Sequence, residues 1–376
     1  MLKLDRIVLR EIRLRLKEPF RISSGMTQER RILLVEIRND TGAIGWGECV
    51  AGEEPYFSAE TVDTAWFAIE HFVAPLVLGT RFDHPRLVFP ALDGVFRGHP
   101  MAKAAVEMAC WELAATEAGC SLSEALGGER DQVEVGISIG IQKSPEALVD
   151  RAAQAFAEGY RKIKIKIAPG EDVEYVEAVR RALGPEAPLM ADANSAYRLE
   201  DAAHLARLDE LDLMMIEQPL DREDLLRHAA LQRKLKTPIC LDESITGPDR
   251  TEDMLALGAG KIVNIKPGRV GGFAQSIAIH KLCRNAGVPV WCGGMLESGI
   301  GRAHNVALAS LEGFTKPGDL SPSQRYWERD IVEPEWTMSA DGRVRVPRDR
   351  PGMGVDVDRE RIEHLTVRRA ELRPAS

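Results

Sequence analysis

Short runs of apolar residues recur along the second half of the chain, and stretches with helical periodicity separate most of them. Strands that alternate with helices in this way form βα units, whose strands run parallel. Near-continuous apolar runs are typical of strands buried on both faces. Eight runs separated by about seven helices predict a closed α/β barrel. The runs are residues 133–141, 162–167, 188–194, 213–219, 238–244, 261–267, 289–294 and, more weakly, 313–319.

The region before the barrel mixes two periodicities. Residues 3–16 and 31–38 alternate like strands, and the polar stretch SSGMTQER between them is expected to be a loop. Residues 58–78 and 101–118 have the spacing of helices, and the second ends at a glycine that suits a helix C-terminus. This pattern predicts an α+β region.

The segment that follows the barrel is long enough to hold further secondary structure. It holds another helical segment near residues 357–365, which is expected to pack back on the first region. We therefore divide the chain into an α+β region (1–128), a barrel (129–324) and a returning C-terminal segment (325–376).

Residues 162–167 read KIKIKI, so isoleucines occupy one face of the predicted strand and lysines the other. One interpretation is an amphipathic strand with its lysines in water. The other is that the lysines face the barrel interior, where burying like charges is costly and requires a function or partners. Lys162 lies deeper than Lys164 and Lys166 and is interpreted as a charge of the barrel floor or of the bottom rim.

Charged residues also recur at the ends of the next four strands. Lys166 is followed by Asp192, Glu217, Asp242 and Lys266, at intervals of 24 to 26 residues. This interval is the length of one βα unit, so the five side chains lie at one height on successive strands. The C-terminal rim, where these strands end, is where barrel enzymes carry out their chemistry.

In a ring of eight strands, the second and sixth are opposite each other, so Lys166 and Lys266 face across the barrel mouth. Asp192, Glu217 and Asp242 lie on the wall between them. A single carboxylate at a strand end is commonly a helix cap or a surface charge, but three in register repel unless a cation lies among them. Oxygen ligands without histidine or cysteine favour Mg²⁺, with Mn²⁺ also accepted.

Several neighbours have supporting roles in this interpretation. Asn194 shares the face of Asp192 and either supports the site or forms an Asx turn. Ser138 on the first strand is either structural or touches the substrate. Glu243 should point away from the site as a supporting or structural carboxylate, because it directly follows Asp242.

Two segments after the later strands complete the candidate set. The glycine-rich stretch after the seventh strand begins with Gly293, Gly294 and Met295, which are expected to let the backbone approach the substrate closely. Arg269 follows Lys266 by three residues. It either adjusts the charge state of that lysine or anchors the loop.

Composition excludes several classes of function. The chain has 376 residues, a net charge of −9 and 44% apolar residues, which argues against nucleic acid or an anionic membrane as a partner. Six scattered cysteines without a CxxC pair indicate reduced thiols, and neither a signal peptide nor a membrane-spanning run is recognisable. We expect a cytoplasmic homo-oligomer that acts on a small-molecule carboxylate.

Eight stretches along the chain read as family motifs: WGECV, GYRKIKIKIAPG, DANSAY, IEQPL, TPICLDES, IVNIKPGRVGG, VWCGGMLESGIGRAHN and PGDLS. They resemble those of the enolase superfamily and its muconate-lactonizing subgroup, in particular the o-succinylbenzoate synthase / N-succinylamino acid racemase (N-acylamino acid racemase) family. The resemblance implies a modified TIM barrel, (β/α)7β, under a capping domain built from both termini. It implies Mg²⁺ on Asp192, Glu217 and Asp242, with Lys166 and Lys266 as acid/base residues.

The chemistry shared by such enzymes is removal of a proton α to a carboxylate, which requires a neutral base and a cation that stabilises the product charge. The positive charge of Lys164 is expected to favour neutral Lys166, and Arg269 to act likewise on Lys266. Two opposed lysines permit racemisation, and one lysine acting alone permits the dehydration of menaquinone biosynthesis. The family is known for both.

Other functions stay open. Dipeptide epimerases usually carry a D-x-D pair after the eighth strand, where this chain has Asp319 and Ser321. Muconate cycloisomerases share the lysines and carboxylates, and a non-catalytic metal-binding barrel is the alternative of a different class. Substrate choice is expected to depend on segments 20–29 and 52–58, the first of which should close over the substrate.

Overall fold

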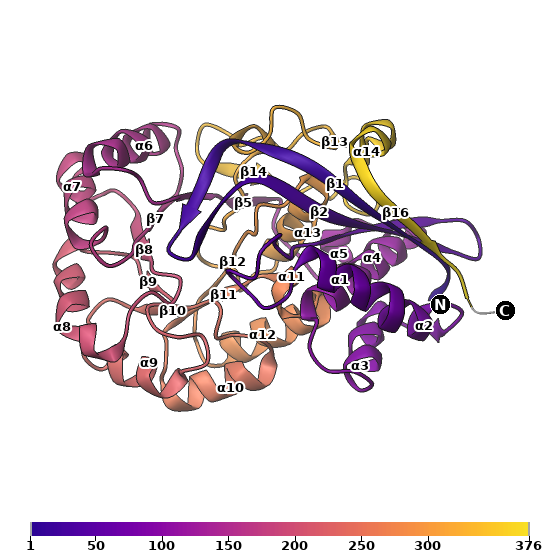
Figure 1. Ribbon diagram of the computed structural model, residues 1–376, viewed down its shortest axis with the longest axis horizontal. Helices are drawn as coiled ribbons and strands as arrows, with labels where there is room; N and C mark the ends of the chain where they lie inside the picture. Colours follow the sequence, from indigo (N-terminus) through magenta and orange to yellow (C-terminus); the bar gives the residue numbers. More distant parts are fainter. Residues whose placement is uncertain (1, 375–376) are drawn as a thin grey trace.

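The computed structural model describes residues 2–374. Figure 1 shows a curled parallel sheet surrounded by helices, with a second sheet beside it. The parallel sheet follows sequence order, β6-β7-β8-β9-β10-β11-β12. Its strands are β6 (Gly136–Ile139), β7 (Lys162–Lys166), β8 (Leu189–Asp192), β9 (Ile216–Glu217), β10 (Ile239–Leu241), β11 (Ile262–Ile265) and β12 (Val290–Cys292). The α/β barrel prediction is confirmed, and these strands fall within the first seven apolar runs.

The eighth predicted strand, 313–319, is not a regular strand. It closes the ring by single bridges from Phe314 to Val290 and from Gly318 to Val135. The backbone N–H of Gly136, the first residue of β6, donates to the carbonyl of Gly318 at 2.6 Å. The segment reads GFTKPGD, and its proline lacks the N–H that a continuous ladder needs.

Helices cover the outside of the sheet (Figure 1). The isoleucines of KIKIKI are fully buried in one core with Val176 and Val179 of the following helix. The lysines of the same strand are buried as well, so the interpretation that placed them in water is wrong. The barrel helices are α6 (Pro145–Ala157), α7 (Val173–Leu183), η3 (Leu199–Asp201), α8 (Ala202–Leu205), η4 (Ala206–Leu211), α9 (Leu225–Gln232), α10 (Pro248–Leu257), α11 (Pro267–Val270), α12 (Phe273–Asn285) and α13 (Gly299–Ala309).

The second sheet is antiparallel and joins both ends of the chain. Its order is β16-β1-β2-β3, and Ile7 of β1 pairs with Leu372 of β16, so the C-terminal segment returns to the first region. The strands are β1 (Leu2–Ile22), β2 (Gly25–Asn39), β3 (Ile44–Cys49) and β16 (Thr366–Leu372), with β4 (Arg81–Phe82) also paired to β1. Helix α4 (Pro100–Ala118) packs against this sheet through buried residues such as Ala105 and Ala109.

Shorter elements complete this part of the molecule. On the N-terminal side they are α1 (Val62–Ala68), η1 (Ile69–Val73), α2 (Ala74–Val77), η2 (Pro85–Leu87), α3 (Val88–Asp93), α5 (Leu122–Leu126) and β5 (Gln132–Glu134). On the C-terminal side they are η5 (Ser323–Arg325), β13 (Val332–Glu333), β14 (Arg343–Arg345), β15 (Asp356–Val357) and α14 (Arg359–Leu365). Among the described residues, no helix combines the length and the apolar character needed to cross a membrane.

The expected loop at 20–29 is instead the end of a long hairpin, because β1 runs to Ile22 and β2 resumes at Gly25. Figure 1 shows this hairpin extending from the capping sheet across the barrel. The tip packs on barrel loops: Arg21 pairs with Glu171 at 3.0 Å, and its carbonyl accepts from Ile141 N–H at 2.9 Å. The sequence of the tip lacks the alternation of apolar and polar residues that marks a strand, because polar contacts and not an apolar core hold the tip in place.

Candidate active site

The charged strand ends meet at one rim of the parallel sheet. Lys166 is in register with Asp192, and Asp192 with Glu217, so neighbouring strands bring these three side chains to one level. Asp242 lies two residues beyond Cys240, the partner of Glu217 on the next strand. All these charged side chains are buried, and Glu217 and Asp242 are fully so.

Each carboxylate of the rim contacts a lysine. The ammonium of Lys166 lies 2.6 Å from Asp192 Oδ2, and that of Lys266 lies 2.7 Å from Asp242 Oδ2. Lys164 lies 3.2 Å from Glu217 Oε2 and 3.4 Å from Asp192 Oδ2. The site is therefore a closed set of opposite charges inside the barrel mouth.

Negative charge is least compensated at Glu217. Burial and the neighbouring Asp192 raise its pKa to about 8, against the opposing effect of Lys164. Burial acts in the same direction on Asp192 and Asp242, but the lysines beside them hold their pKa values below the ordinary range. The nearest ammonium groups therefore do not fully offset the negative charge of the three carboxylates, and the deficit is largest at Glu217.

The residues present suit a hard divalent cation. They are oxygen donors on three adjacent strands, and Asp242 Oδ1 is buried without accepting a hydrogen bond. Within residues 2–374 no three His, Cys, Asp or Glu side chains converge on one ion position, because the carboxylates turn toward lysines instead. Binding an ion would exchange these ion pairs for oxygen–metal contacts.

The structure places Arg269 beside Asp242, so its expected effect on Lys266 stays a prediction. Burial lowers the pKa of Lys266, but Asp242 raises it, and the net shift is upward. Arg269 instead lies 3.2 Å from Asp242 Oδ1 and donates to the carbonyls of Ile245 and Asn264. It acts on the carboxylate and on the loop, which agrees with its interpretation as an anchor.

Lys162 forms a second layer beneath the rim. Its ammonium is fully buried, 3.2 Å from the centre of the Trp291 ring and 3.1 Å from Asp319 Oδ1. The other oxygen of Asp319 lies 2.5 Å from Lys164. One carboxylate thus bridges two of the three lysines of KIKIKI, and sequence reasoning had not connected them.

Asn194 links the site to Glu243. Its Oδ1 accepts from Lys166 at 2.7 Å, and its Nδ2 donates to Glu243 Oε1 at 2.9 Å. Glu243 therefore contacts the site through an amide and does not point fully away from it. Ser138 lies on the cavity wall, and its buried hydroxyl has no hydrogen-bond partner among the described residues.

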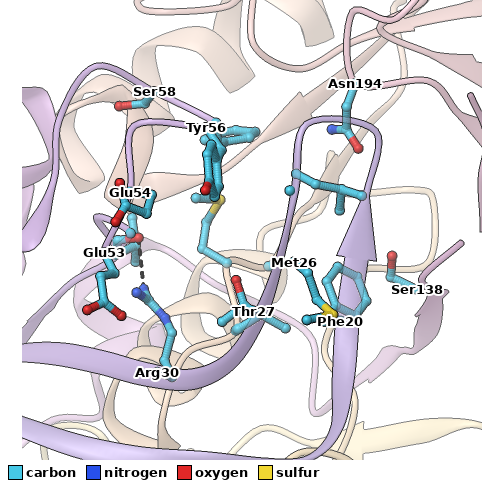
Figure 2. Close-up of a pocket in the computed structure, with 18 of the residues that line it drawn as sticks. Phe20, Met26, Thr27, Arg30, Glu53, Glu54, Tyr56, Ser58, Ser138 and Asn194 are labelled. Atoms are coloured by element: carbon cyan, nitrogen blue, oxygen red, sulfur yellow. Dashed lines mark hydrogen bonds between the residues drawn. The ribbon is translucent and has the colours of Figure 1, made fainter.

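A cavity of about 270 Å³ opens above the rim between the barrel and the capping part. Barrel residues at its floor include Lys164, Lys166 and Lys266, and Gly294 and Met295 also line it. The capping part supplies the opposite wall, which Figure 2 shows with Phe20, Met26 and Thr27 on the hairpin and Tyr56 across from them. Both segments expected to govern specificity therefore reach the cavity.

Two residues of the site were missed or explained differently. Asn264, two residues before Lys266, donates to Glu217, and the period-2 alternation of the strand was the signal for it. Gly293 does not line the cavity; a Cβ there would lie 2.2 Å from Asn264 Oδ1 and 2.7 Å from Lys266 Cε. The glycine makes room for these two side chains.

Comparison with known families covers both parts of the chain. Residues 147–361 match the family described as "Enolase C-terminal domain-like". Residues 5–127 match the family described as "Mandelate racemase / muconate lactonizing enzyme, N-terminal domain". The two matches together leave only short segments outside.

Individual relatives extend over nearly the whole chain. An o-succinylbenzoate synthase from Geobacillus kaustophilus is 50% identical over 97% of this chain and 96% of its own length. An N-succinylamino acid racemase from Thermus thermophilus is 48% identical over 97% of this chain and 98% of its own. The crystal structure of an enolase superfamily member from Listeria innocua, 38% identical, superposes with a TM-score of 0.94 over 99% of this chain and 100% of its own.

Proposed function

This chain belongs to the enolase superfamily, and on that premise we propose that it removes a proton α to a carboxylate, as an N-succinylamino acid racemase, an o-succinylbenzoate synthase, or both. The observation that carries the proposal is the register of three buried carboxylates between two lysines at the barrel mouth. The relatives that bear the two names are about equally similar to this chain.

Asp192, Glu217 and Asp242 would hold the Mg²⁺ ion, with Mn²⁺ as a substitute. A bound ion would supply positive charge against the negative charge that develops on the substrate as the α-proton leaves. The carboxylates are held in place by neighbours: Lys166 contacts Asp192, and Arg269 contacts Asp242. Because the side chains of the rim are buried, each charge there acts more strongly than it would in solution.

The two lysines would act on opposite faces of the substrate α-carbon. In racemisation, one removes the proton and the other returns a proton to the other face, which inverts the stereocentre. In dehydration, Lys166 takes the proton and then delivers it to the leaving hydroxyl. Lys166 is tied to Asn194 and Lys266 lies 4.5 Å from the centre of the Phe57 ring, so the two ammonium groups have different surroundings.

The cavity supports an acylated substrate with an apolar part. Phe20, Met26, Phe57 and Met295 line it, whereas charged groups gather at its floor. A dipeptide epimerase is less well supported, because Asp319, the carboxylate positioned to meet a substrate ammonium, is already bound by Lys162 and Lys164. A muconate cycloisomerase stays the alternative within the superfamily, and a non-catalytic metal-binding barrel the alternative outside it.

Proton exchange tests the proposal. The purified protein with MgCl2 should exchange the α-proton of N-succinyl-phenylalanine with D2O and interconvert its enantiomers, and EDTA should stop both. Loss of water from the o-succinylbenzoate precursor, measured in parallel, assigns the synthase activity. Absence of both α-proton exchange and water loss in the presence of Mg²⁺ would overturn the proposal in favour of one of the two alternatives, a muconate cycloisomerase or a non-catalytic barrel.

A further inference from the structure

We propose that Asn264 is a positioning residue that fixes the orientation of Glu217 toward a divalent cation; this inference rests on the proposed function. Asn264 lies on β11 and shares a strand face with Lys266, two residues on. Its Nδ2 donates to Glu217 Oε1 at 2.6 Å, and both residues are fully buried.

The two oxygens of Glu217 have different partners. Oε1 accepts from Asn264, and Oε2 lies 3.2 Å from the ammonium of Lys164. Asp192 also contacts the ammonium of Lys164, so it lies on the same side of Glu217 as Oε2 does. The amide therefore holds one oxygen away from the rim and leaves the other directed at the remaining charges of the site.

The surroundings of Asn264 are built to keep its amide in this position. Gly293 leaves the space that the amide occupies, since a Cβ there would lie 2.2 Å from Oδ1 and 2.7 Å from Nδ2. Arg269 donates to the backbone carbonyl of Asn264 at 3.0 Å. The orientation of the amide is set by Glu217, because the reverse placement would bring two acceptor oxygens together in a buried site.

A neutral donor has an advantage over a lysine at this place. Glu217 is buried beside Asp192 and Asp242, and its Oε1 would cost free energy if it had no partner. A further ammonium would satisfy the oxygen but would also repel a divalent cation. The amide satisfies Oε1 without adding charge, so it can stay bonded to Glu217 while Oε2 changes its partner.

The chain provides a matched control for this interaction. Asn305 on α13 donates through Nδ2 to Glu297 Oε1 at 2.8 Å, and both residues are buried. This pair has the same chemistry but lies outside the rim. Replacing either asparagine by leucine exchanges the amide for an apolar group with the same number of heavy atoms and leaves a glutamate without its donor.

The test is calorimetric titration of the metal-stripped protein with MnCl2 and MgCl2. Asn264→Leu should weaken ion binding by about 10- to 100-fold, as is usual when a residue that orients a metal ligand is lost. Asn305→Leu should bind the ions as the wild type does, although thermal unfolding of both variants should show a loss of stability.

Two further outcomes keep the inference distinct from the proposed function. Should Asn264→Leu fail to fold, Asn264→Ser, which retains a small donor, should still bind Mn²⁺ more weakly than Asn305→Leu does. Equal ion affinity in the wild type and the Asn264 variants would overturn the positioning role alone. A wild type that binds neither ion would overturn the proposed function and the inference with it.

Discussion

Four lysines lie inside the barrel, and the partner of each decides what the residue can do. Lys166 and Lys266 each contact one rim carboxylate. Lys164 contacts Glu217, Asp192 and Asp319, and it shares Asp319 with Lys162. Removing one member of a buried ion pair leaves an uncompensated charge, which costs more than the pair itself contributes. The bridging residue Asp319 should therefore matter more to stability than either of its partners.

We predict that Asp319→Asn lowers the free energy of unfolding by about 3–5 kcal/mol, because it leaves the buried ammonium of Lys162 without its carboxylate and removes one of the carboxylates beside Lys164. Lys162→Met should cost less, since Asp319 keeps Lys164 and the thioether can pack on Trp291. Urea unfolding followed by tryptophan fluorescence measures both. A larger loss for Lys162→Met than for Asp319→Asn would contradict this order.

A site residue could be predicted from the sequence only where a regular sequence pattern marks it. Asp192, Glu217 and Asp242 were found because one charged residue recurs per βα unit. The contact of Asn264 with Glu217 was not found, because it joins strands that are not adjacent in the sheet. The charge state of Lys266 depends on burial and on Asp242 together, and spacing alone reveals neither.

Among the elements, the hairpin of β1 and β2 is the one that connects the cavity to the barrel surface. Its tip is held by the bidentate pair of Arg21 with Glu171, at 3.1 and 3.0 Å, and by one backbone hydrogen bond. Ser23 adds a contact to the carbonyl of Asn194 at 3.3 Å. An exposed ion pair contributes about 0–1 kcal/mol, so the tip is held weakly enough to open.

We predict that Glu171→Ala makes the hairpin tip more sensitive to protease and raises KM by up to about fivefold, with little change in kcat, because a pair worth about 1 kcal/mol is lost. Limited proteolysis and steady-state kinetics measure the two effects. Arg15→Ala is the control, because Arg15 pairs with Glu29 within the hairpin at 2.6 Å and does not reach the barrel. Equal protease sensitivity in the two variants would show that the ion pair of Glu171 does not hold the hairpin tip on the barrel.

Two glutamates of the capping part bind the first turns of barrel helices. Glu107 of α4 accepts from Phe273 and Ala274 N–H at 2.8 and 2.9 Å, at the start of α12. Glu48 of β3 accepts from Ser298 and Gly301 N–H at 3.1 and 3.0 Å, at the start of α13. Burial raises the pKa of each carboxyl to about 7, against the effect of these donors.

These shifts predict how stability depends on pH. A carboxyl with a raised pKa binds its proton more tightly when folded, so its stabilising contribution is complete below about pH 4.5 and is lost as pH rises through 7. Glu107→Gln should therefore remove up to about 1.4 kcal/mol per pH unit from the slope of the unfolding free energy in this window. Urea unfolding from pH 5 to 8 measures the slope, and identical slopes in variant and wild type would refute the assignment.

The elements that sequence predicted poorly are those stabilised by long-range contacts. The barrel strands were found because each is short, apolar and followed by a helix. The 313–319 segment closes the ring by two single bridges, so its sequence needs no strand pattern. The hairpin tip was expected to be a loop because its polar residues face the barrel loops and not an apolar core.

For the whole molecule, the cavity exists only where the capping part and the barrel meet. The capping sheet needs both termini, because β16 pairs with β1. The floor of the cavity comes from the barrel and most of the opposite wall from segments near residues 20–29 and 52–58. Under the proposed function, the barrel would supply the chemistry and the capping part would govern substrate choice.

A cation bound at the rim should stabilise the folded chain as a whole. At a Mg²⁺ concentration 100 times its dissociation constant, we predict an increase of about 2.7 kcal/mol in the free energy of unfolding, reversed by EDTA. Glu217→Gln should abolish most of this increase because it removes one ligand charge. Thermal unfolding with and without MgCl2 measures this increase. An equal increase in the variant would show that Glu217 does not bind the ion.

The central claim is that Lys166 and Lys266 each serve one face of the substrate, and NMR-monitored α-proton exchange of the two N-succinylamino acid enantiomers in D2O tests it most directly. Lys266→Ala should exchange one enantiomer only and interconvert neither. Lys166→Ala should exchange only the other, and each missing reaction should fall by at least about 10²-fold. If either single variant exchanges both enantiomers at comparable rates, the account of two opposed lysines is wrong.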